Sequence, residues 1–264
     1  MISLFLTREV AGIEVDANGR TACTDEEGYF LLRVPADGLS PGWHSVSVTL
    51  VGEPRTEVQA PVLIPDQRAR WFVVSDIDDT VLKTGAYSLL RNLWTSLTGN
   101  ALTRRVFPDA VELLAALHDQ GRNPVYYVSS SPWNLHDFLG RIFARHGLVR
   151  GPMSLQDFGL SDRGLVKASD RIHKANAIDA LMAAHPSLQA VLVGDTGQHD
   201  PQVYAEVAAR WPGRVHLVIL RQPHRRSAPD SHALAQLAAA GVPVQLGPDF
   251  TEALRSAAWE SVPG

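Results

Sequence analysis

The sequence predicts an α/β protein in which a doubly wound parallel sheet follows a small N-terminal β-sandwich. From residue 70 onward, short apolar runs alternate with helical patterns, and such runs are typical of strands buried between two helix layers. Residues 1–65 instead show short alternating segments between glycine, proline and acidic clusters, without a helical period. This change of pattern predicts two domains, 1–65 and 66–264, joined by a linker over 61–66.

Four short segments of the N-terminal part have the composition of strands. They are GRTACT (19–24), GYFLLRVP (28–35), WHSVSVTLVG (43–52) and TEVQAPVLIP (56–65). Between Trp43 and Val51, apolar and hydroxyl side chains alternate with a period of two, which places unlike side chains on the two faces of a strand. We expect a small antiparallel sandwich of about five strands.

The C-terminal part contains four apolar runs that alternate with five helical patterns. The expected strands are WFVVSD (71–76), NPVYYVSS (123–130), LQAVLVGD (188–195) and GRVHLVIL (213–220). The expected helices cover 109–120, 134–146, 173–185, 201–210 and 231–241. In a sheet of this class the active site lies outside the carboxyl ends of the strands, so residues that directly follow the runs are the candidates for chemistry.

Composition and charge exclude several classes of protein. Of the 264 residues, 45% are hydrophobic and 20% are charged, which favours a folded core over a disordered chain. The net charge of -4 argues against a nucleic-acid-binding protein. Cys23 is the only cysteine, which excludes an intramolecular disulfide, and no apolar run approaches the roughly 20 residues of a membrane span. We therefore expect a cytoplasmic protein without a transmembrane segment.

Three carboxylates in four positions follow the first predicted parallel strand. Asp76, Asp78 and Asp79 belong to the segment DIDDT, where their mutual repulsion requires a cation or shared protons. A dense set of oxygen ligands is typical of Mg²⁺, which binds carboxylates together with water and substrate phosphate. The alternative is a solvated acidic turn that caps a helix, which accounts for any single aspartate here.

A second acidic group, GDTGQHD, follows the predicted strand at 188–195. Asp195 ends that strand, and we expect it to contribute to the same metal site. Asp200 is placed where the next helix should begin, so metal binding and simple helix capping are both open for it.

Serines and a lysine supply further polar groups near the predicted sheet edge. The serines of VSSSP precede a helix, where they can bind a phosphate oxygen or serve as ordinary caps. Lys174 opens a later helix, and the chain has only two other lysines, Lys83 and Lys167. A lysine is a compact point charge, suited to a place beside a phosphate and a carboxylate. Lys167 is the alternative for the same role.

Together, these motifs resemble those of the haloacid dehalogenase superfamily, whose members are mostly Mg²⁺-dependent phosphatases that work through an aspartyl-phosphate. The resemblance is stronger to the catalytic domain of the phosphatidate phosphatases named after the fungal actin-patch protein. Four strings carry it, namely WFVVSDIDDTVLKTGA, VYYVSSSPWNL, RIHKANAI and VLVGDTGQHDPQVYAEVA. It covers residues 70–222, and the N-terminal β segment is similar to the small domain that precedes it in bacterial relatives.

The resemblance implies a role for each matching residue. Asp76 is the expected nucleophile, and Asp78 is the expected acid/base that protonates the leaving alkoxide and later activates water. Ser129 is expected to hold a phosphoryl oxygen, and Lys174 to stabilise Asp76 and the developing charge. Mg²⁺ is expected to bind Asp76, Asp195 and the backbone carbonyl of Asp78.

The implied function is Mg²⁺-dependent hydrolysis of a phosphomonoester, with phosphatidate as substrate and diacylglycerol and phosphate as products. The protein is then expected to work peripherally at a membrane surface. A phosphatase of a soluble phosphate ester and a catalytically weak lipid- or protein-binding module are the alternatives. A minimal cap at 85–107 has an apolar helical face that either contacts the membrane or packs on the sheet. Protein partners, oligomeric state and the role of the N-terminal domain stay open.

Overall fold

A computed structural model of the chain describes residues 10–26, 28–52, 56–83, 106–156, 166–223, 227–257 and 259–260, with the backbone alone at 166–170. Its contacts divide the chain into two compact units, 1–67 and 68–264. The domain limits expected from the sequence, 1–65 and 66–264, stay a proposal. Each unit contains its own sheet.

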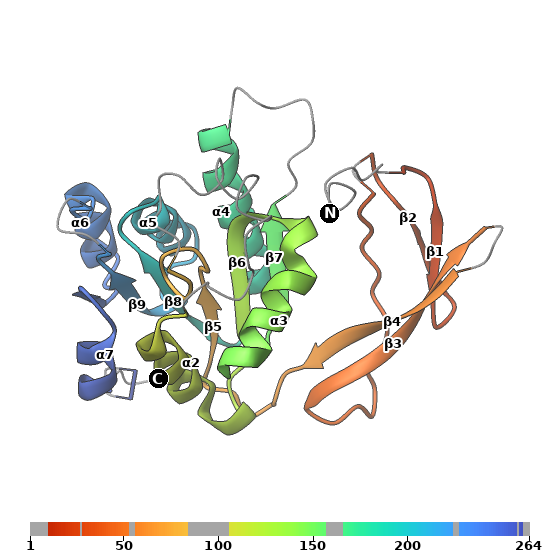
Figure 1. Ribbon diagram of the computed structural model, residues 1–264, viewed down its shortest axis with the longest axis horizontal. Helices are drawn as coiled ribbons and strands as arrows, with labels where there is room; N and C mark the ends of the chain where they lie inside the picture. The colour runs from red at the N-terminus through yellow and green to blue at the C-terminus, as the bar shows by residue number, and fades with distance from the viewer. Residues whose placement is uncertain are drawn as a thin grey trace. The chain divides into compact units, whose positions relative to one another are not determined.

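The first unit contains an antiparallel sheet with the strand order β2-β1-β3-β4 (Figure 1). Its strands are β1 (Glu14–Ala17), β2 (Arg20–Cys23), β3 (Gly42–Val51) and β4 (Thr56–Ile64). Val15, Ala17 and Val48 form a buried core, and Leu32 and Val34 from the segment between β2 and β3 pack against it. This cover gives the unit a sandwich-like core, and the predicted all-β character of the N-terminal part is confirmed.

Two details of this sheet differ from the expected strands. The segment 28–35 forms no strand, because only part of it reaches the core and its Leu31 is 79% exposed. β1 has no counterpart among the expected strands, since it has only four residues, two of them acidic. Its hairpin to β2 turns at Asn18 and Gly19, whose positive φ angles of 52° and 74° are those of a type I′ turn. The Asn-Gly pair is the sequence signal that identifies this hairpin.

The second unit is built on a parallel sheet with the strand order β10-β9-β8-β5-β6-β7. Its strands are β5 (Trp71–Ser75), β6 (Val125–Pro132), β7 (Met153–Gln156), β8 (Gln189–Asp195), β9 (Val215–Arg221) and β10 (Val244–Gly247). Its helices are α2 (Pro108–His118), α3 (His136–His146), α4 (Val166–Ala184), α5 (Asp200–Arg210), α6 (Ser231–Ala239) and α7 (Thr251–Ser256). Two short 3-10 helices are η3 (Asp119–Gly121) and η4 (Trp133–Leu135).

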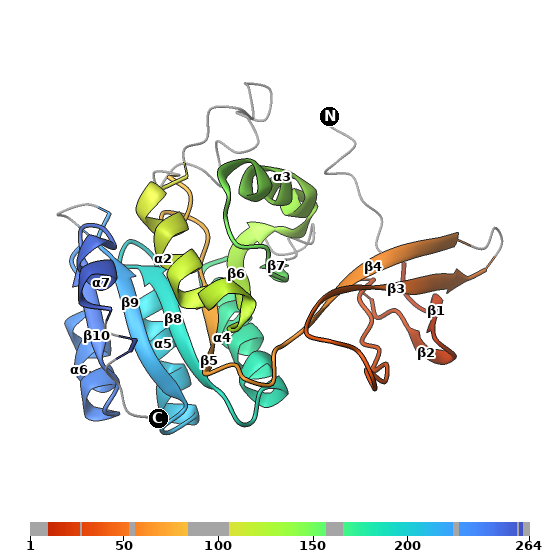
Figure 2. The same ribbon diagram turned by 90° about the horizontal axis from the view of Figure 1, so that it is seen from below.

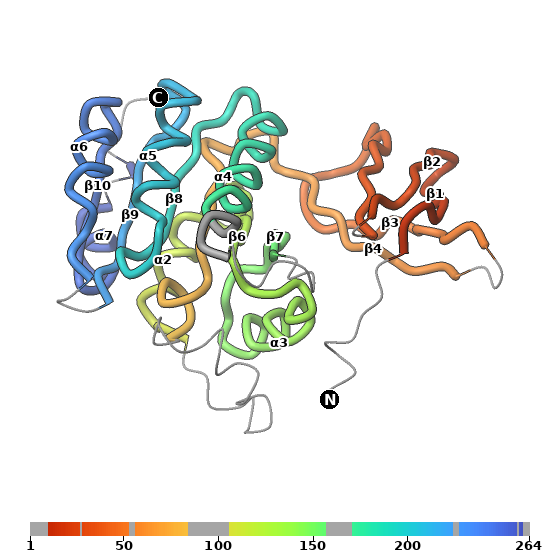
Figure 3. The backbone as a smooth tube through the Cα atoms, turned by 90° about the horizontal axis from the view of Figure 1, so that it is seen from above, coloured from red at the N-terminus to blue at the C-terminus, as the bar shows by residue number. Residues whose placement is uncertain are grey.

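Helices cover both faces of this sheet (Figures 2 and 3). α4, α5 and α6 lie on one face and share a buried core with the strands, whereas α2, α3 and α7 lie on the other. β5 and β8 are neighbours although β6 and β7 lie between them in the chain, so the strand order reverses at this point. Such a reversal opens a crevice at the carboxyl ends of the strands, where ligands bind in this class of fold.

The four apolar runs expected as parallel strands form β5, β6, β8 and β9, and the predicted fold class is confirmed. β5 and β9 are buried along their whole length, as strands between two helix layers should be. The outer strands β7 and β10 have no counterpart among the expected elements. Each has only four residues of mixed polarity, because an edge strand is less enclosed than a central one.

The minimal cap expected at 85–107 lies almost wholly outside the described residues, which include only its last two, Val106 and Phe107. Its contacts, with membrane or with sheet, stay a prediction. Across the described ranges, no helix is long and apolar enough to cross a membrane.

Candidate active site

Asp76 directly follows β5, at the reversal of the strand order. Its backbone N–H donates to the carbonyl of Val193 in β8 (2.9 Å), and its side chain is buried. The chain then turns sharply, and the amide of Val81 donates to the carbonyl of Ile77 (2.9 Å). Within this turn, the hydroxyl of Thr80 donates to Asp76 Oδ2 (3.2 Å). The nucleophile expected from the sequence is therefore held by the strand end and by the turn that follows it.

Asp195 ends the neighbouring strand β8, and Asp200 begins the helix α5. The backbone N–H of Asp195 donates to Asp200 Oδ2 (3.0 Å), while the amides of Gly197 and Gln198 donate to Asp195 Oδ1. Gly194 permits this approach, because a Cβ at that position would lie 2.5 Å from Asp200 Oδ2. Asp200 thus reaches back to β8. Its side chain accepts from the backbone N–H of Asp195 and does not cap the helix α5.

Lys174, from the helix α4, joins Asp76 at the end of β5 to Asp200 at the start of α5. Its ammonium nitrogen lies 2.7 Å from Asp76 Oδ1 and 2.7 Å from Asp200 Oδ1, and the residue is buried. Burial by itself lowers the pKa of Lys174, but the carboxylates of Asp200 and Asp76 outweigh burial and raise that pKa above its usual value. The lysine is therefore a fixed positive charge between two acids. Lys167, the alternative, lies in the part of α4 where only the backbone is described.

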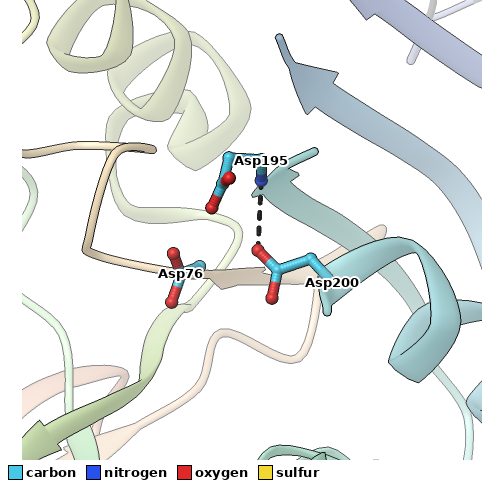
Figure 4. Close-up of side chains that lie close together, drawn as sticks. All are labelled: Asp76, Asp195 and Asp200. Carbon is cyan, nitrogen blue, oxygen red and sulfur yellow. Dashed lines mark hydrogen bonds between the residues drawn. The ribbon is translucent and has the colours of Figure 1, made fainter. Parts of the chain in front are cut away.

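Asp76, Asp195 and Asp200 form a buried carboxylate cluster (Figure 4). Each offers one oxygen, and these oxygens lie within 4.8 Å of one another. Among the described residues, Asp195 Oδ2 has no hydrogen-bond partner, which is costly for a buried carboxylate unless a cation or proton is present. Burial raises the pKa of Asp76 and of Asp195, Lys174 opposes this rise, and the Asp200 carboxylate raises both pKa values further. Oxygen donors, an unpaired buried oxygen and excess negative charge together fit a divalent cation.

Asp78 belongs to the same turn as Asp76, but its carboxylate hydrogen-bonds to serines at the end of β6. Asp78 Oδ2 accepts from Ser131 Oγ (2.7 Å) and from Ser129 Oγ (3.1 Å). The Asp78 carbonyl accepts from Gln198 Nε2 at 3.4 Å, which is long for a hydrogen bond. The structure therefore places a second polar group, Asp78 with two serines, on the strand next to the carboxylate cluster.

The structure brings the residues expected from the sequence to one edge of the sheet. They are Asp76, Asp78, Ser129, Lys174 and Asp195. The side chain of Asp200 joins the cluster, whereas the Asp78 carboxylate does not, and the Asp78 carbonyl as a metal ligand stays a prediction. Sequence reasoning gave no separate role to Thr80 in DIDDT or to Ser131 in VSSSP. A hydroxyl within a motif has no signal of its own, because only the local backbone decides whether it meets a carboxylate.

The family model of the catalytic domain of phosphatidate phosphatase APP1 matches residues 71–222, which is more than half of the chain. The chain belongs to this family. The match to the APP1 catalytic-domain family runs from β5 to the end of β9, and it includes every residue of the site described above. The resemblance expected from the motifs is thereby confirmed.

Two curated proteins align with this chain at 25% and 24% identity. Phosphatidate phosphatase APP1 of Saccharomyces cerevisiae is 25% identical over 149 residues, which are 56% of this chain and 25% of the yeast protein. An uncharacterized protein of Schizosaccharomyces pombe is 24% identical over 208 residues, which are 75% of this chain and 34% of that protein. The chain therefore spans between a quarter and about a third of the length of these relatives.

Two solved phosphatase structures align with most of the chain at low identity. D,D-heptose 1.7-bisphosphate phosphatase from B. bronchiseptica, complexed with magnesium and phosphate, is 15% identical with a TM-score of 0.42 and covers 72% of this chain and 99% of its own. Phosphoserine phosphatase, as a phospho-aspartyl intermediate analogue, is 11% identical with a TM-score of 0.43 and covers 71% and 99%. At these TM-scores neither likeness bears on the chemistry of this chain.

Proposed function

We propose that the chain is a Mg²⁺-dependent phosphomonoester hydrolase that works through an aspartyl-phosphate on Asp76. The observation that carries this proposal is the buried Asp76 carboxylate, which lies against the ammonium group of Lys174 and within a cluster of three acids. Membership of the APP1 catalytic-domain family supports the same reaction. A carboxylate nucleophile divides a slow hydrolysis into two displacements, each assisted by groups held in place.

In the first displacement, a carboxylate oxygen of Asp76 forms a bond to phosphorus. The bond from phosphorus to the leaving oxygen breaks, and its electron pair stays on that oxygen. Asp78 gives this oxygen a proton, so the product leaves as a neutral alcohol. In the second displacement, Asp78 takes a proton from water while the water oxygen bonds to phosphorus. The bond from Asp76 to phosphorus then breaks, which restores the carboxylate and releases phosphate.

Lys174 and Ser129 have supporting roles in this scheme. Lys174 donates to Asp76 Oδ1, so it fixes the direction of the nucleophile while its charge stabilises the phosphoryl oxygens. Ser129 is fully buried at the end of β6, one strand from Asp76, where its hydroxyl can donate to a phosphoryl oxygen. Lys174 is fixed against Asp76 before substrate arrives, so little reorganisation of this charge accompanies the reaction.

The side chains of Asp76 and Asp195 and the backbone carbonyl of Asp78 would hold Mg²⁺, and Asp200 belongs to the same carboxylate cluster. When bound, the ion neutralises the acids of the cluster and the charge on the phosphoryl oxygens. Among the described residues, Asp195 Oδ2 has no hydrogen-bond partner, and this supports the assignment because a buried carboxylate oxygen without one is costly unless a cation binds it.

We propose phosphatidate, presented at a membrane surface, as the substrate, with diacylglycerol and phosphate as products. The family to which the chain belongs is named for this activity, and so is the yeast relative. Trp133 is 37% exposed and follows Pro132, the last residue of β6, where its indole can contact the acyl part of a lipid. A soluble phosphate ester and a weakly active binding module are the outcomes from which the experiment must distinguish this substrate.

The test is phosphate release from phosphatidate in mixed micelles and from glycerophosphate and p-nitrophenyl phosphate, in Mg²⁺ and in EDTA. We expect Mg²⁺-dependent release from phosphatidate, abolished in Asp76→Asn and reduced about 100-fold or more in Asp78→Asn. The control is Asp137→Asn, because that aspartate is 87% exposed on α3 and should not affect release.

Each contrary outcome removes a different part of the proposal. Release from the soluble esters alone contradicts the lipid substrate. Unchanged release in Asp76→Asn contradicts the nucleophile. The absence of release from all three esters contradicts enzymatic function and favours the binding module.

A further inference from the structure

Two serines compete for one oxygen of the Asp78 carboxylate. Ser131 Oγ donates to Asp78 Oδ2 at 2.7 Å, and Ser129 Oγ donates to the same oxygen at 3.1 Å. Ser129 Oγ also accepts the backbone N–H of Ser131 at 2.9 Å. Both serines are at least nine-tenths buried, whereas Asp78 is only partly buried. The carboxylate of this partly buried residue is thus held by its Oδ2 oxygen.

The single proton of each hydroxyl limits what the two serines can do. In this structure the proton of Ser129 is directed at Asp78, so a phosphoryl oxygen can receive it only if Ser129 releases Asp78. Ser131 makes the shorter of the two bonds, and it holds Asp78 without help from Ser129. A division of roles between neighbouring hydroxyls follows from this geometry.

We propose that Ser131 is a positioning residue that holds Asp78 by Oδ2, which frees Ser129 to bind the phosphoryl group. Among the described residues, the side-chain hydrogen bonds to this carboxylate end on Oδ2, so Oδ1 is the oxygen that exchanges a proton with the leaving alcohol. The inference rests on the proposed function, since it assigns the orientation of the acid/base. It gives Ser131 a role of its own, separate from that of Ser129 in the same serine run.

A merely structural role for Ser131 predicts a different pattern of loss. If Ser131 only stabilised the end of β6, its removal would slow every substrate alike. If it orients the acid/base, the loss depends on the leaving group, because an alkoxide needs the proton and p-nitrophenolate does not. The comparison of two leaving groups therefore separates orientation from stability.

The experiment measures kcat/KM for p-nitrophenyl phosphate and for the alkyl ester that the wild type hydrolyses best, dioctanoyl phosphatidate or glycerophosphate, because kcat/KM covers the steps up to loss of the alcohol and excludes the later step in which Asp78 activates water. We expect Ser131→Ala to lower kcat/KM for the alkyl ester about tenfold or more, with a much smaller loss for p-nitrophenyl phosphate. Ser131→Thr keeps the hydroxyl and should restore the alkyl activity. Ser129→Ala, in contrast, should slow both esters, because both present the same phosphoryl group.

A double-mutant comparison with Asp78→Ala completes the test. In that background Ser131 has no carboxylate to hold, so Ser131→Ala should cause no further loss with p-nitrophenyl phosphate, whereas Ser129→Ala should still cause one. Equal losses for both esters in Ser131→Ala, or a further loss in the Asp78→Ala background, would overturn the inference. Failure of the proposed function is recognised separately, as wild-type activity that Asp76→Asn leaves unchanged or as no activity at all. Thermal unfolding of each variant shows that the fold is retained.

Discussion

The ammonium nitrogen of Lys174 lies 2.7 Å from Asp200 Oδ1, and this bond ties the helix α4 to the start of α5. The same nitrogen also contacts Asp76, so one buried lysine neutralises part of a three-carboxylate cluster. Lysine suits this place because a compact ammonium group can donate to one acid after a strand and to another at the start of a helix. The charge of Lys174 is therefore needed for the fold as well as for the proposed chemistry.

Replacement of Lys174 by methionine tests this double role. We expect Lys174→Met to lower the free energy of unfolding by about 3–5 kcal/mol in EDTA, because two buried carboxylates lose their partner. Mg²⁺ should stabilise the variant more than it stabilises the wild type, since the cluster then carries more uncompensated negative charge. Urea unfolding with and without Mg²⁺ measures both effects. The control is Arg141→Met on the exposed surface of α3, and equal stability of the two variants would contradict the prediction.

A methyl group at Gly194 should disturb the same cluster from the strand side. A Cβ there would lie 2.5 Å from Asp200 Oδ2 and 2.6 Å from the hydroxyl of Tyr204, so Asp200 must move. We expect Gly194→Ala to cost about 1–3 kcal/mol and to weaken the stabilisation by Mg²⁺.

The matched control for this substitution is Gly140→Ala in α3, where no atom lies within 4 Å of the added Cβ. That change should instead stabilise the protein by about 0.5–1 kcal/mol, because alanine is the better helix former. Calorimetric unfolding with and without Mg²⁺ distinguishes the two alanines. A stabilising effect at Gly194 would show that the close approach of Asp200 is not required.

The central part of the fold could be predicted because its strands are enclosed on both faces. An enclosed strand must be apolar throughout, so β5 and β9 are visible as uninterrupted apolar runs. β7 and β10 have one less neighbour, and their short segments MSLQ and VQLG look like loops. The segment 28–35 shows the converse error, since its apolar residues include the exposed Leu31.

Some residues of the candidate site could be predicted from the sequence, and others could not. Asp76 and Asp195 could be predicted because each ends a recognisable strand, and strand ends in a parallel sheet meet at one edge. Asp200 was ambiguous, since an aspartate at a helix start looks the same in sequence whether it caps the helix or reaches across to β8. The sequence does not distinguish Ser131 from Ser129 and Ser130 in the run of three serines. Only the backbone at the end of β6 decides which hydroxyls meet Asp78.

Replacement of Arg221, at the end of β9, should lower the free energy of unfolding about as much as replacement of Lys174, although Arg221 lies outside the carboxylate cluster. Its guanidinium donates to Asp109 Oδ2 at 2.7 Å and lies 4.0 Å and 4.2 Å from the ring centres of Phe107 and Phe250. We expect Arg221→Met to cost about 3–5 kcal/mol, because it leaves Asp109 without its cation. Arg221→Lys should recover little of this loss, since an ammonium group cannot stack between two rings and donate as a planar fork does.

The exposed ion pair between Arg122 and Asp119 supplies the control for Arg221. Its N–O distance of 2.9 Å is similar, but both side chains are more than 40% exposed. Arg122→Met should therefore change the free energy of unfolding by less than about 1 kcal/mol. Urea unfolding of the two methionine variants measures the difference, and similar costs would contradict the importance of burial.

His185 should contribute to the pH dependence of stability. It precedes β8, whereas the carboxylate cluster lies at the carboxyl end of that strand. His185 Nε2 hydrogen-bonds with the hydroxyl of Tyr126 at 2.7 Å, and the ring lies 5.0 Å from that of Phe72. Burial lowers the pKa of His185, and the nearby charge of Arg214 lowers it further. The folded protein therefore binds a proton here less readily than the unfolded chain does.

The sign of the effect follows from this difference in proton binding. Near pH 7 and above, neither state is protonated at His185, so its contribution to stability is fully present there. As the pH falls through about 6.5, the unfolded chain takes up a proton that the folded state resists, and stability decreases. We expect His185→Gln to reduce the loss of stability between about pH 7.5 and about pH 5.5. The matched control is His136→Gln, at a histidine whose side chain is 58% exposed on α3, and this variant should keep the wild-type slope. Identical slopes in the wild type and in His185→Gln would show that this histidine titrates alike in the folded and unfolded states.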